Sequence, residues 1–187
     1  IYAYYSNAGV ESATTASQNV SGISCAGTGI CSVSYNTIAN LTNFTTIGYL
    51  YSINMNSTSG TANGNLMHSN VIKGYTGTGA VIGINSNGGN NTITNNVIKL
   101  GDNTACEIRG INDGSSATST SSYHNTIYIG GSPVTGAFPS YCEFSSGPAT
   151  KKYYKNNIFV NARSNNGATG SHYALYLNST NTGTLEI

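Results

Sequence analysis

Charged residues are scarce in this sequence. Only 7% of its 187 residues are Asp, Glu, Lys or Arg, and the formal net charge is +1, whereas soluble domains carry about 25% charged residues. Nucleic acids and anionic membrane surfaces are bound through clusters of Lys and Arg. The composition therefore argues against both as partners, and solubility has to come from Asn, Ser, Thr and Gly.

Long apolar runs and helical periodicity are also missing. No run approaches the roughly 20 apolar residues that cross a bilayer, so membrane insertion is not expected. No segment keeps an apolar period of 3.6 residues, which argues against a helical repeat. The acidic residues are too dispersed for a calcium site, and we expect neither a cofactor nor a metal.

Isoleucine and 14 tyrosines are present instead, in β-branched and aromatic clusters typical of strands. Two strand motifs alternate along the chain and each recurs about every 30 residues. The first begins with Asn and continues with apolar residues, as in "NVIKL", starting at residues 36, 70, 96, 125 and 157. The second closes on an apolar residue followed by Asn or Ser, as in "VIGIN", ending at residues 54, 85, 112, 145 and 178.

Two interleaved strand motifs with a period near 30 residues indicate a solenoid. We predict an all-β fold: a single right-handed parallel β-helix over residues 1–187, with about five to six coils. Stacked coils place equivalent side chains in columns. The first motif predicts an Asn ladder and an apolar column beside it, formed by Asn70, Asn96, Asn125 and Asn157 and by Ile72, Ile98, Ile127 and Phe159.

The second motif gives a less regular pattern. Its closing apolar residues predict a core column of Ile53, Ile84, Ile111, Phe144 and Leu177. Two positions earlier the column would be Tyr51, Ile82, Arg109, Cys142 and Leu175, and Arg109 does not suit an apolar interior. Either a bulge changes the inward–outward alternation near "EIRGIN", or the alignment slips there.

Departures from the repeat predict surface loops. Residues 7–35 are read as a long insertion containing "CAGTGIC", and residues 130–140 as a Pro/Gly loop. We expect the four cysteines to form two disulfides, Cys25–Cys31 and Cys106–Cys142, in an oxidising environment. The alternative, a zinc site, requires tighter paired spacings. The chain lacks an initiator Met and ends in a strand-like "GTLEI", so we expect a segment of a longer protein.

The phrases "YHNTIYIGG", "YKNNIFVNARSNNGATGSHYALYLN" and "NNTITNNVIKLG" resemble right-handed, pectate-lyase-like parallel β-helix repeats of large secreted surface proteins from Bacteroidetes-type bacteria. The resemblance covers most of residues 36–187. It implies the architecture, and a place in a long exported, cell-surface or adhesin-like chain.

Two groups of residues could form sites. Lys73, Lys99 and Tyr128 would share an outward column that could hold a glycan, or that simply keeps the surface soluble. Glu107, Arg109 and Asp113 form the one local charged cluster, which could serve a polysaccharide lyase or hydrolase. The alternative is an Arg–Glu ion pair beside a turn at "NDG".

Glycosylation sequons begin at six asparagines: Asn19, Asn40, Asn43, Asn56, Asn90 and Asn178. Whether they carry glycans depends on the source organism.

We therefore expect a secreted structural or adhesive segment, located outside the cell or on its surface, that assembles end to end with copies of itself and contacts extracellular glycans. The alternatives are a carbohydrate-active enzyme and a pure glycan-binding module.

Overall fold

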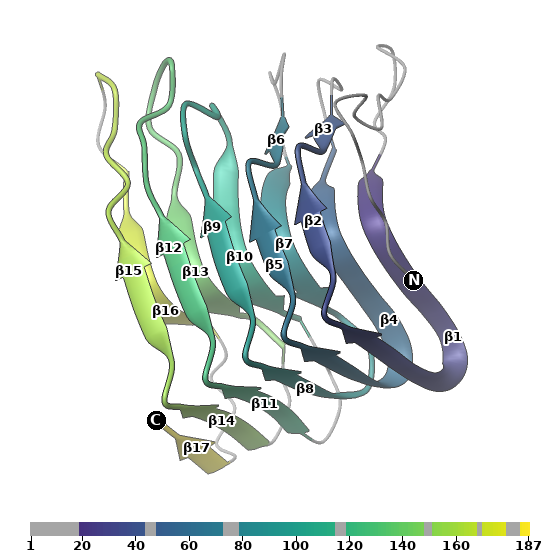
Figure 1. Cartoon of the computed structure of the whole chain (residues 1–187). Coiled ribbons are helices and arrows are strands. Elements are labelled where there is room, and N and C mark those ends of the chain that lie inside the picture. The colour runs from purple at the N-terminus through teal and green to yellow at the C-terminus, as the bar shows by residue number, and fades with distance from the viewer. Residues whose placement is uncertain are drawn as a thin grey trace.

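The structure is a computed structural model that describes residues 19–43, 48–72, 79–114, 119–147, 151–167, 170–178 and 184–187. Within these ranges every regular element is a β-strand, and the strands stack in parallel into a β-solenoid of about five turns (Figure 1). This confirms the predicted fold class. No described segment forms a helix capable of crossing a membrane.

The strands of the coils form three walls, which we call A, B and C (Figure 1). The two first strands, β1 (Val20–Ser34) and β4 (Leu50–Asn63), are long and run through both wall A and wall B. Later coils divide them: wall A contains β7 (Ala80–Ser86), β10 (Glu107–Asp113), β13 (Ser140–Ser145) and β16 (His172–Leu177). Wall B contains β8 (Asn90–Thr94), β11 (Ser119–Tyr123), β14 (Lys151–Lys155) and β17 (Thr184–Glu186).

Wall C is a separate five-stranded sheet. Its strands are β2 (Thr37–Ala39), β5 (Leu66–His68), β9 (Val97–Leu100), β12 (Thr126–Ile129) and β15 (Ile158–Asn161). In the first two coils the chain turns a further corner after wall C and forms a short strand, β3 (Thr42–Asn43) in one coil and β6 (Val71–Ile72) in the next. These two strands pair with each other. The walls enclose one core of buried aliphatic side chains.

The corner between walls B and C carries an asparagine ladder. In each coil a residue with positive φ precedes the ladder Asn, a conformation that Gly, Asn and His adopt more readily than other residues. These corner residues are Tyr35, Gly64, Asn95, His124 and Asn156. The ladder that follows them is Asn36, Asn65, Asn96, Asn125 and Asn157.

The side-chain amide of each interior ladder residue has hydrogen-bond partners for both its oxygen and its nitrogen. Asn96 Oδ1 accepts from both the backbone N–H and Nδ2 of Asn65, each at 3.0 Å. Asn96 Nδ2 donates to Asn125 Oδ1 and to the backbone carbonyl of Ala62, each at 3.0 Å. The ladder thus satisfies buried polar groups that would otherwise destabilise the corner.

The prediction of an Asn ladder is correct for three of its four members and wrong for Asn70. The ladder position of that coil belongs to Asn65, because "NVIKG" at 70 follows the extra corner and forms β6 instead. The same shift replaces Ile72 by Met67 in the apolar column, which runs Met67, Ile98, Ile127 and Phe159. Like side chains still stack, but two of the assigned positions are wrong.

The strands of wall A explain the irregular pattern of the second motif: the inward–outward alternation changes, and the predicted alignment also slips. Gly110 and Ile111 are consecutive and both buried, so the alternation changes there and Arg109 faces outward while Ile111 faces inward. The alignment also slips, by one residue on β13 and by two on β16, since Ile111 pairs with Glu143 and Glu143 with Leu175. A one-residue slip exchanges the two faces of a strand, so Glu143 occupies the core position predicted for Phe144.

The region predicted as an insertion is described from Asn19 onward, and there it is strand β1, paired with β4 from Val20↔Leu50 to Ser34↔Asn63. Over these residues the chain forms a coil of the solenoid, interrupted by one register shift, rather than a surface loop. The expected disulfide Cys25–Cys31 is present and encloses the register shift of β1 between Gly27 and Ile30.

The second predicted disulfide is absent, because Cys106 and Cys142 are free and buried. Arg109 pairs with Tyr141, which places Cys142 beside Gly110, four residues along the strand from Cys106. That offset corresponds to roughly 13 Å at about 3.3 Å per residue, well beyond the reach of a disulfide. Burial raises the pKa of each thiol to about 12.

The remaining loop and glycosylation predictions can be compared with burial. Residues 130–139 connect β12 to β13, and the predicted loop therefore overlaps β13 only at Ser140. Asn43 is completely buried, so it could not carry a glycan in the folded chain. The other sequon asparagines are exposed: Asn19, Asn40, Asn56, Asn90 and Asn178.

Candidate functional site

The outer face of wall A carries four aromatic side chains in contact, which we call the aromatic cluster: Tyr141, Phe144, Tyr173 and Tyr176. Tyr141 stacks on Tyr173 with ring centroids 5.5 Å apart and an interplanar angle of 3°. Phe144 stacks on Tyr176 at 5.4 Å and 11°. The parallel register of β13 and β16 aligns both pairs, so the four rings form one continuous aromatic patch.

Arg109 extends the aromatic cluster toward the previous coil. Its guanidinium carbon lies 4.0 Å from the centre of the Phe144 ring, a cation–π contact. Its Nε donates to Glu107 Oε1 at 2.5 Å and its Nη1 to Asn112 Oδ1 at 2.7 Å. Asn112 in turn continues an outer amide column by donating to Asn85 Oδ1 at 2.7 Å. The apolar rings are therefore bordered by fixed hydrogen-bonding groups.

The local environment disfavours ionisation of two tyrosines on this face, Tyr141 and Tyr51. Partial burial raises the pKa of Tyr141, and the nearby Glu107 carboxylate raises it further, while Arg109 opposes both. Burial likewise raises the pKa of Tyr51, which belongs to the same outer column. A surface of neutral rings and amides, with its one arginine paired to a carboxylate, suits a polar but uncharged ligand.

The predicted catalytic trio does not come together. Glu107 and Arg109 form the expected ion pair on the outer face, but Asp113 is completely buried inside the solenoid. Asp113 is the last residue of β10 rather than a turn residue. The wall separates it from the other two side chains, so these three residues cannot act on one substrate.

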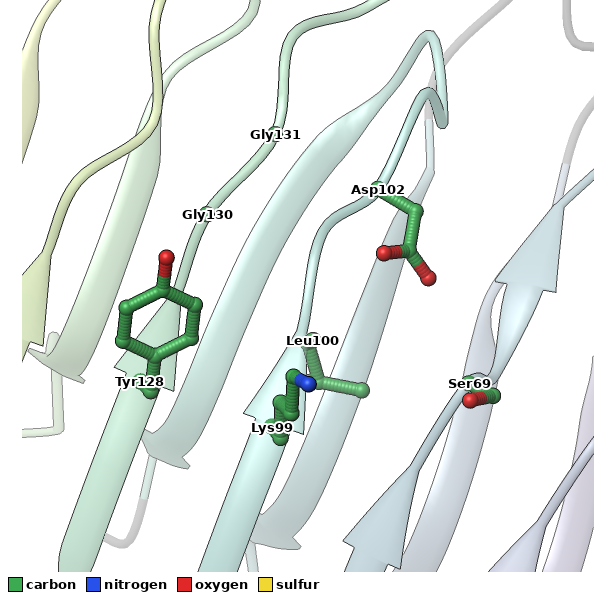
Figure 2. Close-up of a pocket in the computed structure, with 7 residues that line it drawn as sticks. All are labelled: Ser69, Lys99, Leu100, Asp102, Tyr128, Gly130 and Gly131. Atoms are coloured by element: carbon green, nitrogen blue, oxygen red, sulfur yellow. The ribbon is translucent and has the colours of Figure 1, made fainter.

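A second surface feature lies at the end of wall C. Ser69, Lys99, Leu100, Asp102, Tyr128, Gly130 and Gly131 line a groove of about 250 Å³. Figure 2 shows Lys99 and Tyr128 at the ends of neighbouring strands, with Asp102 and Ser69 on the other side of Lys99. A Cβ at Gly130 would lie 2.6 Å from Tyr128 Oη, so a larger residue there would require the Tyr128 side chain to move.

The predicted Lys73–Lys99–Tyr128 column is only partly described. Lys99 and Tyr128 are direct neighbours in the register of β9 and β12, as expected. The next position on β5 is His68, and Lys73 lies outside the described residues. No group of three His, Cys, Asp or Glu side chains is arranged for metal binding in the described ranges.

The sequence contains a signal for the aromatic cluster that the predicted alignment missed. "YCEF" at 141–144 and "YALY" at 173–176 both place aromatic residues three positions apart, in successive coils. Because the change of alternation falls between those positions, both aromatics face outward. Detecting the cluster required the correct register of wall A.

The fold and its outer surface define a parallel β-solenoid with an aromatic, hydrogen-bonding face on wall A. Comparisons with protein-family models, with curated proteins and with solved structures find no match for this chain. The relationship to pectate-lyase-like surface repeats of Bacteroidetes-type bacteria therefore stays a prediction from the sequence.

Proposed function

We propose that this chain is a non-enzymatic, adhesive segment of a secreted or cell-surface protein, and that it binds a carbohydrate chain along the outer face of wall A. The observation that carries the proposal is the aromatic cluster with Arg109 at its border. Flat rings pack against the apolar faces of sugar rings, and the flanking amide and guanidinium groups hydrogen-bond to hydroxyls. The disulfide Cys25–Cys31 suits an oxidising, extracytoplasmic location.

The geometry favours an extended ligand over a small one. The stacked ring pairs repeat at 5.5 and 5.4 Å from one coil to the next, a spacing comparable to the rise of successive residues in an extended polysaccharide. A chain lying across the coils could therefore contact one row of side chains per sugar. Since Arg109 is already paired with Glu107, we expect neutral glycans to bind better than acidic ones.

Replacing Tyr141 by Ala should weaken carbohydrate binding about tenfold, since the ring is at the centre of the cluster. The measurement is a glycan array with neutral and acidic oligosaccharides, followed by calorimetric titration of the best ligand. Circular dichroism would establish that the variant remains folded.

The matched control is Tyr128→Ala, which removes a tyrosine that is 40% exposed on wall C. It should bind like the wild type. If Tyr128→Ala weakens binding and Tyr141→Ala does not, the groove of wall C is the site and the proposal for wall A is wrong.

Self-association is a second proposed property, motivated by the outermost strands. In the described ranges β15 pairs only with β12, and β16 only with β13, and an unpaired strand edge is a template for another strand. Ile158 and Val160 of β15 are 59% and 43% exposed. Such an edge could accept a further coil of a longer chain or a second copy of this one.

We expect the purified chain to associate in a concentration-dependent manner, and Ile158→Lys to weaken that association about tenfold by placing a charge at the edge. Light scattering coupled to size-exclusion chromatography would measure this. Val97→Lys is the control, because Val97 belongs to the same outer column but to the interior strand β9. A wild type that remains monomeric at all accessible concentrations would contradict self-association.

A further inference from the structure

The interior of the solenoid contains a lysine–aspartate pair. Lys152 Nζ, from β14 of wall B, lies 2.7 Å from Asp113 Oδ2, at the end of β10 of wall A. Asp113 is completely buried and Lys152 is only 7% exposed. The two residues belong to successive coils and to different walls, and water has little access to either charge.

Hydrogen bonds hold the aspartate in a single orientation. Thr120 Oγ1 donates to Asp113 Oδ1 at 3.1 Å, and Ser145 Oγ donates to Asp113 Oδ2 at 3.0 Å. Lys152 also contacts Ser145. The amine therefore approaches one carboxyl oxygen while the other oxygen stays bonded to a fixed hydroxyl.

A second acid, Glu143, lies in the same part of the core. It is on β13 two residues before Ser145 and is completely buried. Ser122 Oγ donates to its Oε2 at 2.9 Å, whereas Oε1 has no hydrogen-bond partner in the described part of the chain. Burial raises the pKa of Glu143 to about 8, with a further increase from Asp113 and a decrease from Lys152. The environment of Glu143 thus favours its protonated, neutral form, so that it adds no third charge beside the pair.

We propose that Lys152 and Asp113 join in an intramolecular isopeptide bond, which forms inside the folded chain with the hydroxyl of Ser145 as the proton relay. Lys152 first passes one proton to Asp113, giving a neutral amine and a carboxylic acid. The nitrogen lone pair attacks Cγ of Asp113, forming the C–N bond. Ser145 Oγ, which contacts both Lys152 Nζ and Asp113 Oδ2, takes the excess proton from nitrogen and gives its own to the departing oxygen.

The C–O bond then breaks and one water molecule leaves, so atoms and charges balance without an oxidant or an external cofactor. Ser145 ends in its starting protonation state. Folding supplies the driving geometry, since well-oriented intramolecular groups react as if at concentrations of about 10⁵–10⁸ M. The product also replaces two buried charges, which are costly to desolvate, by a neutral amide.

The bond would link wall A of one coil to wall B of the next, a connection that the free cysteines Cys106 and Cys142 do not provide. This inference is independent of carbohydrate binding, because Asp113 and Lys152 face the interior. Loss of the bond would leave the outer aromatic cluster in place.

The test is the intact mass of the purified, reduced and unfolded wild-type chain. It should be lighter than the sequence mass by one water molecule, and fragmentation after proteolysis should yield a branched peptide containing both Asp113 and Lys152. Lys152→Met and Ser145→Ala should show the full sequence mass. Lys151→Met, which removes the exposed neighbouring lysine, should still lose the water.

The wild-type mass decides the proposal even if a variant fails to fold. A wild type at full sequence mass overturns it. Asp113 also precedes Gly114, so a cyclic imide at that peptide bond would give the same mass loss. That product contains no branch and would persist in Lys152→Met, and finding it alone would likewise overturn the isopeptide.

Discussion

Replacing Asn96 by Leu should lower the free energy of unfolding by about 3–5 kcal/mol. The side chain is completely buried, and its loss leaves the backbone N–H and Nδ2 of Asn65 without their acceptor and the Ala62 carbonyl without a donor. Each buried unsatisfied group costs about 1–3 kcal/mol. A leucine of similar size fills the space but cannot restore these bonds across three coils.

Equilibrium denaturation in urea measures this effect, with the midpoint and slope compared between variants. The matched control is Asn56→Leu, the same substitution at an exposed asparagine of β4. We expect the control to stay within about 0.5 kcal/mol of the wild type. Equal stabilities for the two variants would mean that the ladder contributes nothing beyond filling space.

The sequence predicts the repetition better than the register. Asn96, Asn125 and Asn157 are recognisable because each precedes a β-branched or aromatic strand of wall C. Asn65 is not, since "NLMH" lacks that composition, whereas "NVIKG" five residues later has it. The informative signal was Gly64, whose positive φ marks the corner. Local composition identifies strands, but a corner residue identifies where a coil turns.

The error in wall A has a different physical origin. When a strand contains two consecutive inward residues, such as Gly110 and Ile111, the strand of the next coil can be aligned with it in either of two registers. Apolarity favoured Phe144 for the core, yet the structure places Glu143 there. A buried acid contradicts the general preference of cores, so composition alone could not have assigned it.

The candidate site was therefore predictable only in part. The Glu107–Arg109 ion pair follows from two residues on one strand face. The separation of Asp113 from that pair, and its meeting with Lys152, depend on which wall each strand joins. Contacts between residues 39 positions apart arise from the stacking of coils, and no local pattern encodes them.

Glu143 should make the stability of this protein fall as the pH rises. Its carboxyl pKa is about 8 in the folded chain against 4.5 for an ordinary glutamate, chiefly because burial disfavours the charged form. The folded state therefore holds a proton that the unfolded state releases between these pH values. The contribution of Glu143 is fully present below pH 4.5, declines between 4.5 and 8, and is lost above 8.

The Glu143→Gln variant isolates this contribution, because glutamine keeps the shape of the protonated acid and cannot ionise. A pKa difference of one unit corresponds to about 1.4 kcal/mol. Between pH 4.5 and pH 9 the free energy of unfolding of the wild type should therefore fall by on the order of 5 kcal/mol relative to that of the variant. Urea denaturation at several pH values measures the difference. Glu107→Gln, on the outer side of the same wall, should follow the wild type. Parallel pH profiles for wild type and Glu143→Gln would show that the buried carboxyl already ionises at low cost, through water or a cation that reaches the interior.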